Sequence, residues 1–366
     1  MQSDLVLVIV VGTALAFDFT NGFHDTANAV ATSISTRAMP PRVAVTLAAL
    51  LNFVGAFLSL AVAATIATGI VNADLITPEI IFAGLIGAIL WNLLTWYFGL
   101  PSSSSHALIG GVVGSTLAAE GTKGVLGDGL VEKVMIPALV APVLAFVTAG
   151  LAILVCYRIV GGRAPGSVNR GFRAGQIVTG SLFALSHGTN DAQKTMGIIF
   201  LALVANGNLQ PTDGVPTWVV LSAATAIALG TYAGGWRIIR TMGTRIIKMD
   251  PAQGFASQAS GAAVILAASN AGFPLSTTHV ISGGIMGAGA AKRVSAVRWG
   301  VAGNIVVAWI LTLPAAAAVG ALTFGVTRIF GAGAAGPLVV SIALVLVLGY
   351  VLGKRLAAGR TLTAEA

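Results

Sequence analysis

Charged residues are scarce in this chain of 366 residues: Asp, Glu, Lys and Arg make up 9% of it, whereas 56% of the residues are hydrophobic. Soluble domains carry roughly 25% charged residues, so the composition excludes a soluble globular protein. Apolar runs of the order of 20 residues, the length needed to cross a bilayer, recur along the chain; they include 43–67, 80–100, 136–156, 218–236 and 338–352. The sequence therefore predicts an all-α polytopic membrane protein with about 10–12 membrane helical segments.

Cysteine and the usual catalytic motifs are also missing. Cys156 is the only cysteine, which excludes an intrachain disulfide. Neither the HExxH nor the CxxC spacing of zinc sites occurs. The GxSxG nucleophile motif and the Gly-rich phosphate loop that ends in Lys do not occur either. We therefore predict a protein that is not an enzyme, that has no cofactor and no certain metal site, and that has no large loop suited to a receptor.

The net charge of +8 does not indicate a nucleic-acid partner. Nucleic-acid readers interleave basic residues with aromatics on one folded face, whereas here the basic residues gather between apolar runs, as in 158–173, 237–248, 292–298 and 354–360. Under the positive-inside rule these segments are cytoplasmic loops. We expect a multi-pass protein of the plasma membrane, in contact with lipid, with its N-terminus outside and its C-terminus in the cytoplasm. The sequence leaves self-association into a homo-oligomer open.

This topology requires two helical hairpins. The segments 79–120 and 250–291 must each enter the membrane and return on the same side. Each is a pair of apolar runs with a proline between them, Pro101 or Pro274. Proline breaks a helix because it removes a hydrogen-bond donor and clashes with the preceding turn. Broken helices are therefore expected at both positions.

Two short polar segments each occur twice in this apolar sequence: Asn21–Asn28 with Ser186–Lys194, and Pro101–His106 with Pro274–His279. Asp25 and Asp191 are 191 − 25 = 166 positions apart, and His106 and His279 are 279 − 106 = 173 positions apart. One half of the chain was thus duplicated to give the other. All four histidines of the chain lie in these segments.

The predicted topology makes the two halves inverted repeats, because the Asp25 segment runs inward and the Asp191 segment runs outward. The expected parts are an N-terminal repeat (1–157), a cytoplasmic connecting loop (158–171), a C-terminal repeat (172–325), and an extra C-terminal helix and tail (326–366). Inverted repeats with broken helices are typical of transporters, in which substrate binds near the middle of the membrane.

Asp25 and Asp191 each interrupt an apolar run, where an ionised carboxylate costs about 2.5 kcal/mol or more. Carboxylates beside amide oxygens suit a hard cation or a titrating proton. The alternative for these acids is a structural ion pair or a helix cap. Asp18 is a third acid and has no counterpart in the second half, so for Asp18 a functional role and a structural role are balanced. The predicted coupling-ion or proton site comprises Asn21, His24, Asp25, Asn28, Asp191 and Gln193.

Hydroxyl clusters follow the two hairpin prolines, at 102–105 and 276–278, and each precedes an expected helix, 107–117 or 280–290. Free backbone N–H groups at a helix N-terminus, together with hydroxyls, can bind an anion. The alternative is that these residues only cap their helices. His106 and His279, which follow the hydroxyls, are either core residues or proton carriers. The pairs Gly110/Gly114 and Gly283/Gly287 have the spacing that packs membrane helices closely.

At these motifs the chain resembles the PiT family of inorganic phosphate transporters, and its bacterial low-affinity branch in particular. The resemblance covers nearly the whole chain, in four motifs that occur in order. It implies that Asp25, Asn28, Asn190 and Asp191 belong to a site for phosphate and its coupling ion. With the neighbouring hydroxyls and lysine, the predicted phosphate-binding residues are Ser103, Ser104, Ser105, Ser276, Thr277, Thr278, Asn190 and Lys194.

Two residues depart from the sodium-coupled pattern of that family. His24 and Lys194 stand where the pattern has Asn. The lysine ammonium either replaces a bound sodium ion or contacts phosphate directly. We expect a secondary-active symporter that works by alternating access, with a proton as the favoured coupling cation and sodium as the other candidate. Phosphate would then enter alone or as a complex with a divalent metal. A sulfate permease of the same fold is the nearest alternative, and an ion channel is a more distant one.

Overall fold

The computed structural model describes residues 2–364, and these form helices joined by short loops, with no β-strand among them. The first half contains α1 (Gln2–Ser35), α2 (Pro41–Gly55), α3 (Ala61–Thr68), α4 (Pro78–Phe98), α5 (Ser104–Glu120), α6 (Gly127–Leu130) and α7 (Ile136–Val160). The second half contains α8 (Pro165–Ala205), α9 (Thr217–Ala233), α10 (Trp236–Arg240), α11 (Pro251–Asn270), α12 (Thr277–Lys292), α13 (Trp299–Ile329) and α14 (Ala335–Ala364).

Several of these helices can cross a membrane. In the described chain four helical segments are long and apolar enough to do so, at 4–35, 78–98, 127–160 and 299–329. A fifth is the pair at 217–233 and 236–245, which is bent by 59°. Large apolar side chains point outward from the bundle, such as Leu139 (74% exposed) and Ile310 (68% exposed). The prediction of an all-α polytopic membrane protein is confirmed.

The two predicted hairpins are present as α4–α5 and α11–α12. Helix α4 ends at Phe98 and is capped by Gly99, whose φ of 66° is the left-handed conformation that glycine adopts without strain. Helix α5 begins after the proline, with Ser103 as its N-cap, and α12 begins with Ser276 as its N-cap. The hairpin tips touch, because the Ser105 hydroxyl donates to the Leu275 carbonyl (3.2 Å).

The paired glycines bring helices from the two halves into backbone contact. Gly110 and Gly114 of α5 lie against α13, and Gly283 and Gly287 of α12 lie against α7. A Cβ atom on Gly114 would lie 2.0 Å from the Ala317 carbonyl oxygen, so no larger residue fits there. The packing role predicted for these glycines is confirmed.

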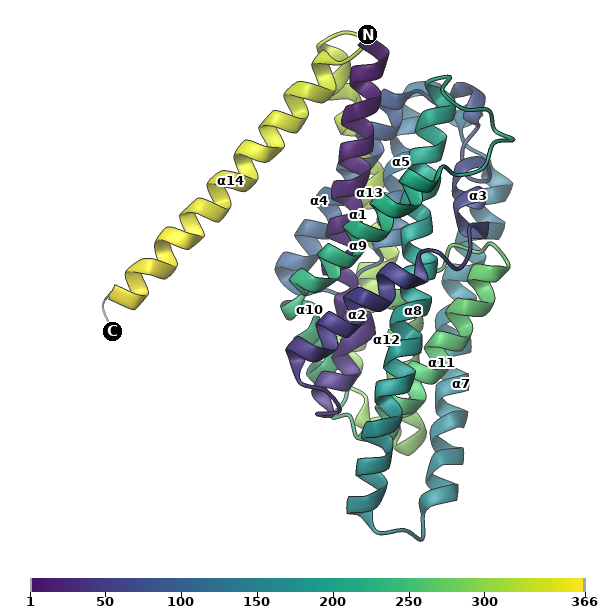
Figure 1. Ribbon diagram of the computed structural model, residues 1–366, viewed down its shortest axis with the longest axis vertical. Coiled ribbons are helices and arrows are strands. Elements are labelled where there is room, and N and C mark those ends of the chain that lie inside the picture. The colour runs from purple at the N-terminus through teal and green to yellow at the C-terminus, as the bar shows by residue number, and fades with distance from the viewer. Residues whose placement is uncertain (1, 365–366) are drawn as a thin grey trace.

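The long helices α1 and α8 run in opposite directions through the bundle (Figure 1). Helix α1 begins at the top of the view, whereas α8 begins at the bottom, where it follows α7, and α14 extends away from the bundle. The segment between α7 and α8 is shorter than the expected loop at 158–171. Helix α7 continues to Val160, and α8 already begins at Pro165, since proline is well suited to the first turn of a helix.

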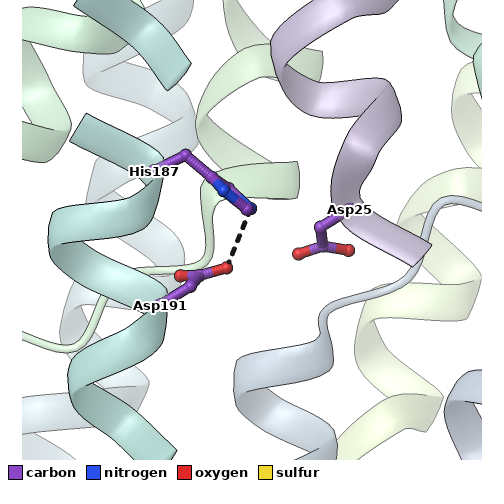
Figure 2. Close-up of side chains that lie close together, drawn as sticks. All are labelled: Asp25, His187 and Asp191. Atoms are coloured by element: carbon purple, nitrogen blue, oxygen red, sulfur yellow. Dashed lines mark ion pairs between the residues drawn. The ribbon is translucent and has the colours of Figure 1, made fainter. Parts of the chain in front are cut away.

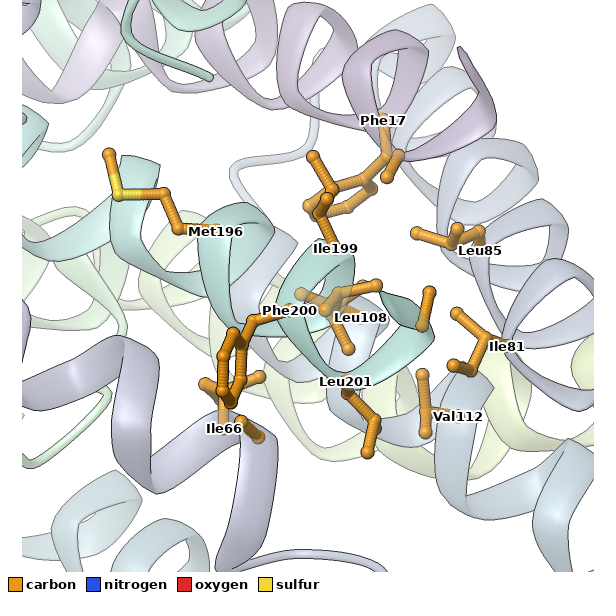
Figure 3. Close-up of a cluster of buried hydrophobic side chains, with 14 of the residues drawn as sticks. Phe17, Ile66, Ile81, Leu85, Leu108, Val112, Met196, Ile199, Phe200 and Leu201 are labelled. Carbon is orange, nitrogen blue, oxygen red and sulfur yellow. The ribbon is translucent and has the colours of Figure 1, made fainter. Parts of the chain in front are cut away.

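A large apolar core surrounds the C-terminal part of α8 (Figure 3). Phe17 of α1, Leu85 of α4, Leu108 of α5 and Ile199 of α8 are fully buried in it. Because lipid is as apolar as these side chains, close van der Waals packing rather than exclusion of water holds such helices together. This core packs α1 against α8 next to the polar motifs.

Candidate functional site

The two duplicated acids meet inside the bundle. Asp25 on α1 and Asp191 on α8 lie close together, with His187 of α8 beside them (Figure 2). One ligand atom from each of the three lies within 4.8 Å of the others. The side chains are buried, with 2% exposure for Asp25 and 0% for the other two. We call these three residues, with the polar groups that contact them, the acid cluster.

Asp25 is held by partners from α1, α5 and α12. His24 Nδ1 lies 2.6 Å from Asp25 Oδ1, and the Ser104 hydroxyl donates to the same oxygen at 3.1 Å. The Thr277 hydroxyl lies between the two acids, 3.4 Å from Asp25 Oδ2 and 3.3 Å from Asp191 Oδ2. A single threonine of the second hairpin thus connects the acids of the two halves.

The His24–Asp25 contact requires a proton. His24 Nε2 lies 3.1 Å from the hydroxyl oxygen of Thr95. That hydroxyl donates to the Trp91 carbonyl at 2.8 Å, so its oxygen accepts from the histidine. With the hydrogen on Nε2, a neutral His24 would turn the lone pair of Nδ1 toward the carboxylate, and the contact would need a further proton. With the hydrogen on Nδ1, the ring donates to the carboxylate directly, so in either case a proton lies between His24 and Asp25.

The second histidine–acid contact, between His187 and Asp191, resembles the first but has other hydrogen-bond partners. The Asn52 amide donates to the Thr231 hydroxyl (2.8 Å), which itself donates to the Ile227 carbonyl (2.8 Å). The Asn52 oxygen is thus left facing His187 Nδ1 at 3.1 Å, and Nδ1 is the donor. His187 Nε2 lies 3.2 Å from Asp191 Oδ2, so this gap also calls for a proton or another cation.

Lys194 supplies the remaining positive charge. Its ammonium donates to Asp191 Oδ1 (2.5 Å), to the Leu275 carbonyl (2.7 Å) and to the Ser105 hydroxyl. An ammonium has three donors, so all of them are used. The Asn190 amide donates to the same carboxylate oxygen and to the Leu275 carbonyl, each at 2.8 Å. The alternative interpretation of the two acids was a structural ion pair or a helix cap. Asp191 is in a buried ion pair with Lys194, so this alternative describes part of its geometry.

The predicted hydroxyls divide into two groups. Ser104, Ser105 and Thr277 contact the acids or Lys194, and Thr278 accepts a hydrogen bond from the Asn28 amide (2.9 Å). In contrast, Ser103 and Ser276 cap their helices: they accept from the backbone N–H of His106 (3.1 Å) and of His279 (3.3 Å). For these two serines the capping alternative describes the geometry.

Asn28 joins the cluster through α12, since its amide also donates to the Thr277 hydroxyl at 3.2 Å. Its carbonyl oxygen is buried and has no hydrogen-bond partner among residues 2–364. Gln193, in contrast, is engaged elsewhere. Its carbonyl oxygen accepts from the backbone N–H groups of Val62 (2.8 Å) and Ala63 (3.2 Å), so it anchors the start of α3. Asn21 lies beside Asp18, one turn before Asp25.

Reasoning from the sequence missed three contributors to the cluster. His187 could have been found, because it precedes Asp191 by four residues and therefore lies on the same face of a helix. The Leu275 carbonyl and Asn52 gave no signal, since one is backbone and the other lies in an apolar run without a repeat. Only the folded chain brings them to the cluster.

His106 and His279 lie next to each other, with ring centroids 4.8 Å apart and the planes nearly perpendicular. Trp309 stacks on His279 at 4.1 Å. These three side chains form part of the wall of an apolar cavity of about 540 Å³ between α7, α12 and α13. Both ring nitrogens of His279 are buried, and within the described part of the chain neither meets the full geometry of a hydrogen bond.

The chain is similar to known proteins over most of its length. The model of the phosphate transporter family matches residues 21–320. A probable low-affinity inorganic phosphate transporter of Mycobacterium tuberculosis (strain ATCC 25618 / H37Rv) is 57% identical over 327 residues, which are 89% of this chain and 78% of the relative. A protein of the same description from Rhizobium meliloti (strain 1021) is 51% identical over 320 residues, 87% of this chain and 96% of the relative.

A solved structure has the same fold. It is described as the sodium-dependent phosphate transporter and superposes with a TM-score of 0.78 at 25% identity, covering 88% of this chain and 99% of its own. These relatives are transporters, so the prediction that the chain is not an enzyme is confirmed. The resemblance inferred from the duplicated motifs is confirmed too: the chain is a multi-pass membrane protein that belongs to the phosphate transporter family.

Proposed function

We propose that this protein is a secondary-active transporter that imports inorganic phosphate together with a cation, by alternating access. One observation carries the proposal. Asp25 from one half, Asp191 from the other, and hydroxyls of both hairpin tips converge on a single buried cluster. Catalytic chemistry is not needed to explain such a site, whereas the binding of an oxyanion beside cations explains each part of it.

The anion would bind at the starts of α5 and α12. Ser104 and Ser105 lie in the first turn of α5, and Thr277 and Thr278 lie in the first turn of α12. Backbone N–H groups at a helix N-terminus favour an anion, and the neighbouring hydroxyls add donors. Because these donors are neutral, they would hold phosphate moderately and release it, as a carrier requires.

Phosphate fits this cluster better than sulfate, the nearest alternative substrate. Near neutral pH phosphate carries a hydrogen that it can donate, and sulfate does not. The buried carbonyl oxygen of Asn28 lacks a donor, and the carboxylates of Asp25 and Asp191 accept hydrogen bonds. Competition by excess sulfate during uptake of labelled phosphate distinguishes the two substrates, and we expect weak competition.

A proton is the coupling cation that the contacts favour. Each of the two His–Asp pairs, His24 with Asp25 and His187 with Asp191, is arranged so that a proton or cation must lie between ring and carboxylate. Lys194 already occupies the cluster as a fixed positive charge. A lysine in that place reduces the need for a sodium ion. Sodium remains the second candidate, because the solved neighbour is described as sodium-dependent.

A divalent metal would enter as part of the cargo. The ligand atoms of Asp25, His187 and Asp191 are close enough together to share one ion. Carboxylates and imidazole together suit Mg²⁺, Mn²⁺ or Zn²⁺. Asn52 holds the far nitrogen of His187, as is usual for histidines that bind metals. Phosphate would then cross the membrane as a metal complex with little net charge.

Alternating access would come from two inverted repeats, 1–157 and 172–325, that move against each other. This division is supported by equivalent contacts in the two halves. Gly55 of α2 lies against Leu185 of α8, while Gly230 of α9 lies against Phe19 of α1, and 19 + 166 = 185. The opposite directions of α1 and α8 also support it (Figure 1). Since the acid cluster is buried, one repeat must shift before phosphate can enter.

Uptake of labelled phosphate into liposomes, with sodium and pH gradients imposed separately, tests this function. We expect accumulation driven by a pH gradient that is acidic outside, increased by Mg²⁺ or Mn²⁺ and insensitive to a sodium gradient. Accumulation driven only by sodium would refute proton coupling. Downhill flux that never exceeds the external concentration would favour a channel. The sidedness of labelling at single added cysteines tests the expected orientation, with the N-terminus outside and the C-terminus in the cytoplasm.

A further inference from the structure

A third acid lies in the same bundle, outside the acid cluster. Asp18 of α1 precedes Asp25 by seven residues, which is about two helical turns. Its side chain is fully buried, and among the described residues no group meets the full geometry of a hydrogen bond with either carboxylate oxygen. An ionised carboxylate in that condition is strongly disfavoured inside a membrane protein. The group must therefore be neutralised, either by a proton or by a bound cation.

Two other unsatisfied oxygens lie beside this carboxylate. They belong to Asn21, one turn further along α1, and to Thr195 of α8. Both side chains are buried, with 1% and 0% exposure, and neither meets hydrogen-bonding geometry with Asp18. Three polar side chains thus face one another, and none has a partner for these oxygens. The Asn21 amide and the Thr195 hydroxyl are the donors nearest to the carboxylate, and both are neutral, so no ion pair with Asp18 is found in the described part of the chain.

The charged groups that act on Asp18 come from α8: they are Asp191 and Lys194. The other helices that pack on this part of α1 are α4 and α9, and their ionisable side chains lie at the helix ends, as Glu79, Tyr97 and Tyr232. The carboxyl of Asp18 is therefore influenced by the acid cluster, although it does not contact the cluster directly.

A proton satisfies this arrangement better than a metal ion does. Hard cations take about six or more oxygen ligands. Helices α1 and α8 are continuous here, so their backbone carbonyls are used within the helices, and only the three side chains offer oxygens. One proton on Asp18, in contrast, needs a single acceptor, which either Asn21 or Thr195 supplies.

We propose that Asp18 is the site that binds and releases a proton transported with phosphate. This inference rests on the proposed function and assigns its coupling step to a residue outside the acid cluster. Lys194 provides the link, because it is adjacent to Thr195 in sequence and is paired with Asp191. When cargo draws Lys194 away from Asp191, the field at Asp18 changes, and the affinity of Asp18 for its proton changes with it.

The test uses the purified full-length protein in liposomes and two measurements. The first is exchange of labelled for unlabelled phosphate at equal pH on both sides, which needs no net proton movement. The second is accumulation driven by a pH gradient. The variants are Asp18→Asn, which mimics the protonated acid, and Asp4→Asn, a control at an exposed acid in the first turn of the same helix.

We expect the rate of phosphate exchange by Asp18→Asn to lie within about twofold of the rate of the unmodified protein. Its accumulation ratio should fall by about tenfold for each unit of pH difference, which is what one coupled proton contributes. Asp4→Asn should match the unmodified protein in both measurements. As an independent variant, Thr195→Val removes the hydroxyl next to the Asp18 carboxyl, so the pH of half-maximal uptake should shift.

Several results would overturn the proposal. Asp18→Asn that accumulates phosphate normally would exclude the residue from coupling, and so would an unchanged pH profile in Thr195→Val. Loss of exchange in a folded Asp18→Asn protein would make Asp18 part of the phosphate site instead. If Asp18→Asn lost only the part of phosphate accumulation that is driven by a sodium gradient, Asp18 would be a sodium site instead. If the unmodified protein transports phosphate without using a pH gradient, the proton coupling of the proposed function fails first, and this inference fails with it.

Discussion

The Lys194 ammonium lies 2.5 Å from the Asp191 carboxylate in the interior of the bundle, with exposures of 1% and 0%. The three ammonium hydrogens go to Asp191, the Ser105 hydroxyl and the Leu275 carbonyl, so one side chain connects α8 to the tips of both hairpins. A cation in this position both neutralises an acid and holds the two halves together. Movement between the halves must therefore break or exchange these contacts.

Replacement of Lys194 by Asn tests whether the ammonium substitutes for a sodium ion. The change removes the positive charge and adds an amide oxygen, so we expect phosphate uptake that has become dependent on sodium. Unpaired Asp191 should also lower stability by about 3–5 kcal/mol in the absence of sodium, as occurs when one partner of a buried ion pair is lost. Sodium titration of uptake and of thermal unfolding measures both effects. Sodium-independent uptake at the normal rate would contradict this role.

Asn52 should control the cation affinity of His187. Asn52→Leu removes the acceptor that keeps the hydrogen on His187 Nδ1. Loss of such a supporting contact typically weakens metal binding by about 10–100-fold. We expect the concentration of Mg²⁺ or Mn²⁺ that gives half-maximal uptake to rise by that factor, and Asn92→Leu, at another buried asparagine, serves as the control. Equal metal dependence in both variants would show that His187 does not bind the metal.

Two neighbouring serines provide a matched pair for the anion site. Ser105 faces Lys194, whereas Ser103 caps α5. Ser105→Ala should raise the KM for phosphate, because a donor to the anion is lost. Ser103→Ala should instead cost about 0.5–2 kcal/mol of stability, the usual value of an N-cap, with KM unchanged. Uptake kinetics and thermal unfolding separate the two effects, and a raised KM in Ser103→Ala alone would reverse the assignment.

The close packing of the hairpin helices gives a prediction on stability. A methyl group on Gly114 or Gly287 would lie 2.0 Å from a backbone carbonyl oxygen of the opposing helix. We expect Gly114→Ala and Gly287→Ala each to cost about 1–3 kcal/mol, the range typical of overpacking. Gly303 of α13 has open space at the corresponding position, so Gly303→Ala is the control and should be neutral or stabilising. Thermal unfolding in detergent compares the three.

Much of the site could be predicted because duplication is visible in the sequence. The spacing of Asp25 and Asp191 and the prolines before each hydroxyl cluster indicated two equivalent broken hairpins, and the N-caps at Ser103 and Ser276 followed from helix chemistry. These features depend on local order along the chain. They were accessible without knowledge of how the helices pack.

The remaining features depend on tertiary contacts. Gln193 belongs to the duplicated segment, yet α3 lies close enough to take its side-chain oxygen through two backbone N–H groups. The orientation of Lys194 is fixed by the Leu275 carbonyl, which no side-chain pattern reveals. The join between α7 and α8 looked like a loop because it is basic and Gly-rich, although Pro165 starts a helix there. The first two departures come from backbone groups that sequence patterns do not describe.

The central claim is that Asp25 and Asp191 serve one shared cargo site. Concentrative phosphate uptake in liposomes by Asp25→Asn and Asp191→Asn, each checked for folding by thermal unfolding, tests it most directly. The account predicts that each variant remains folded and loses concentrative uptake completely, because each half contributes an acid that the other cannot replace. Near-normal accumulation by both variants would contradict the account.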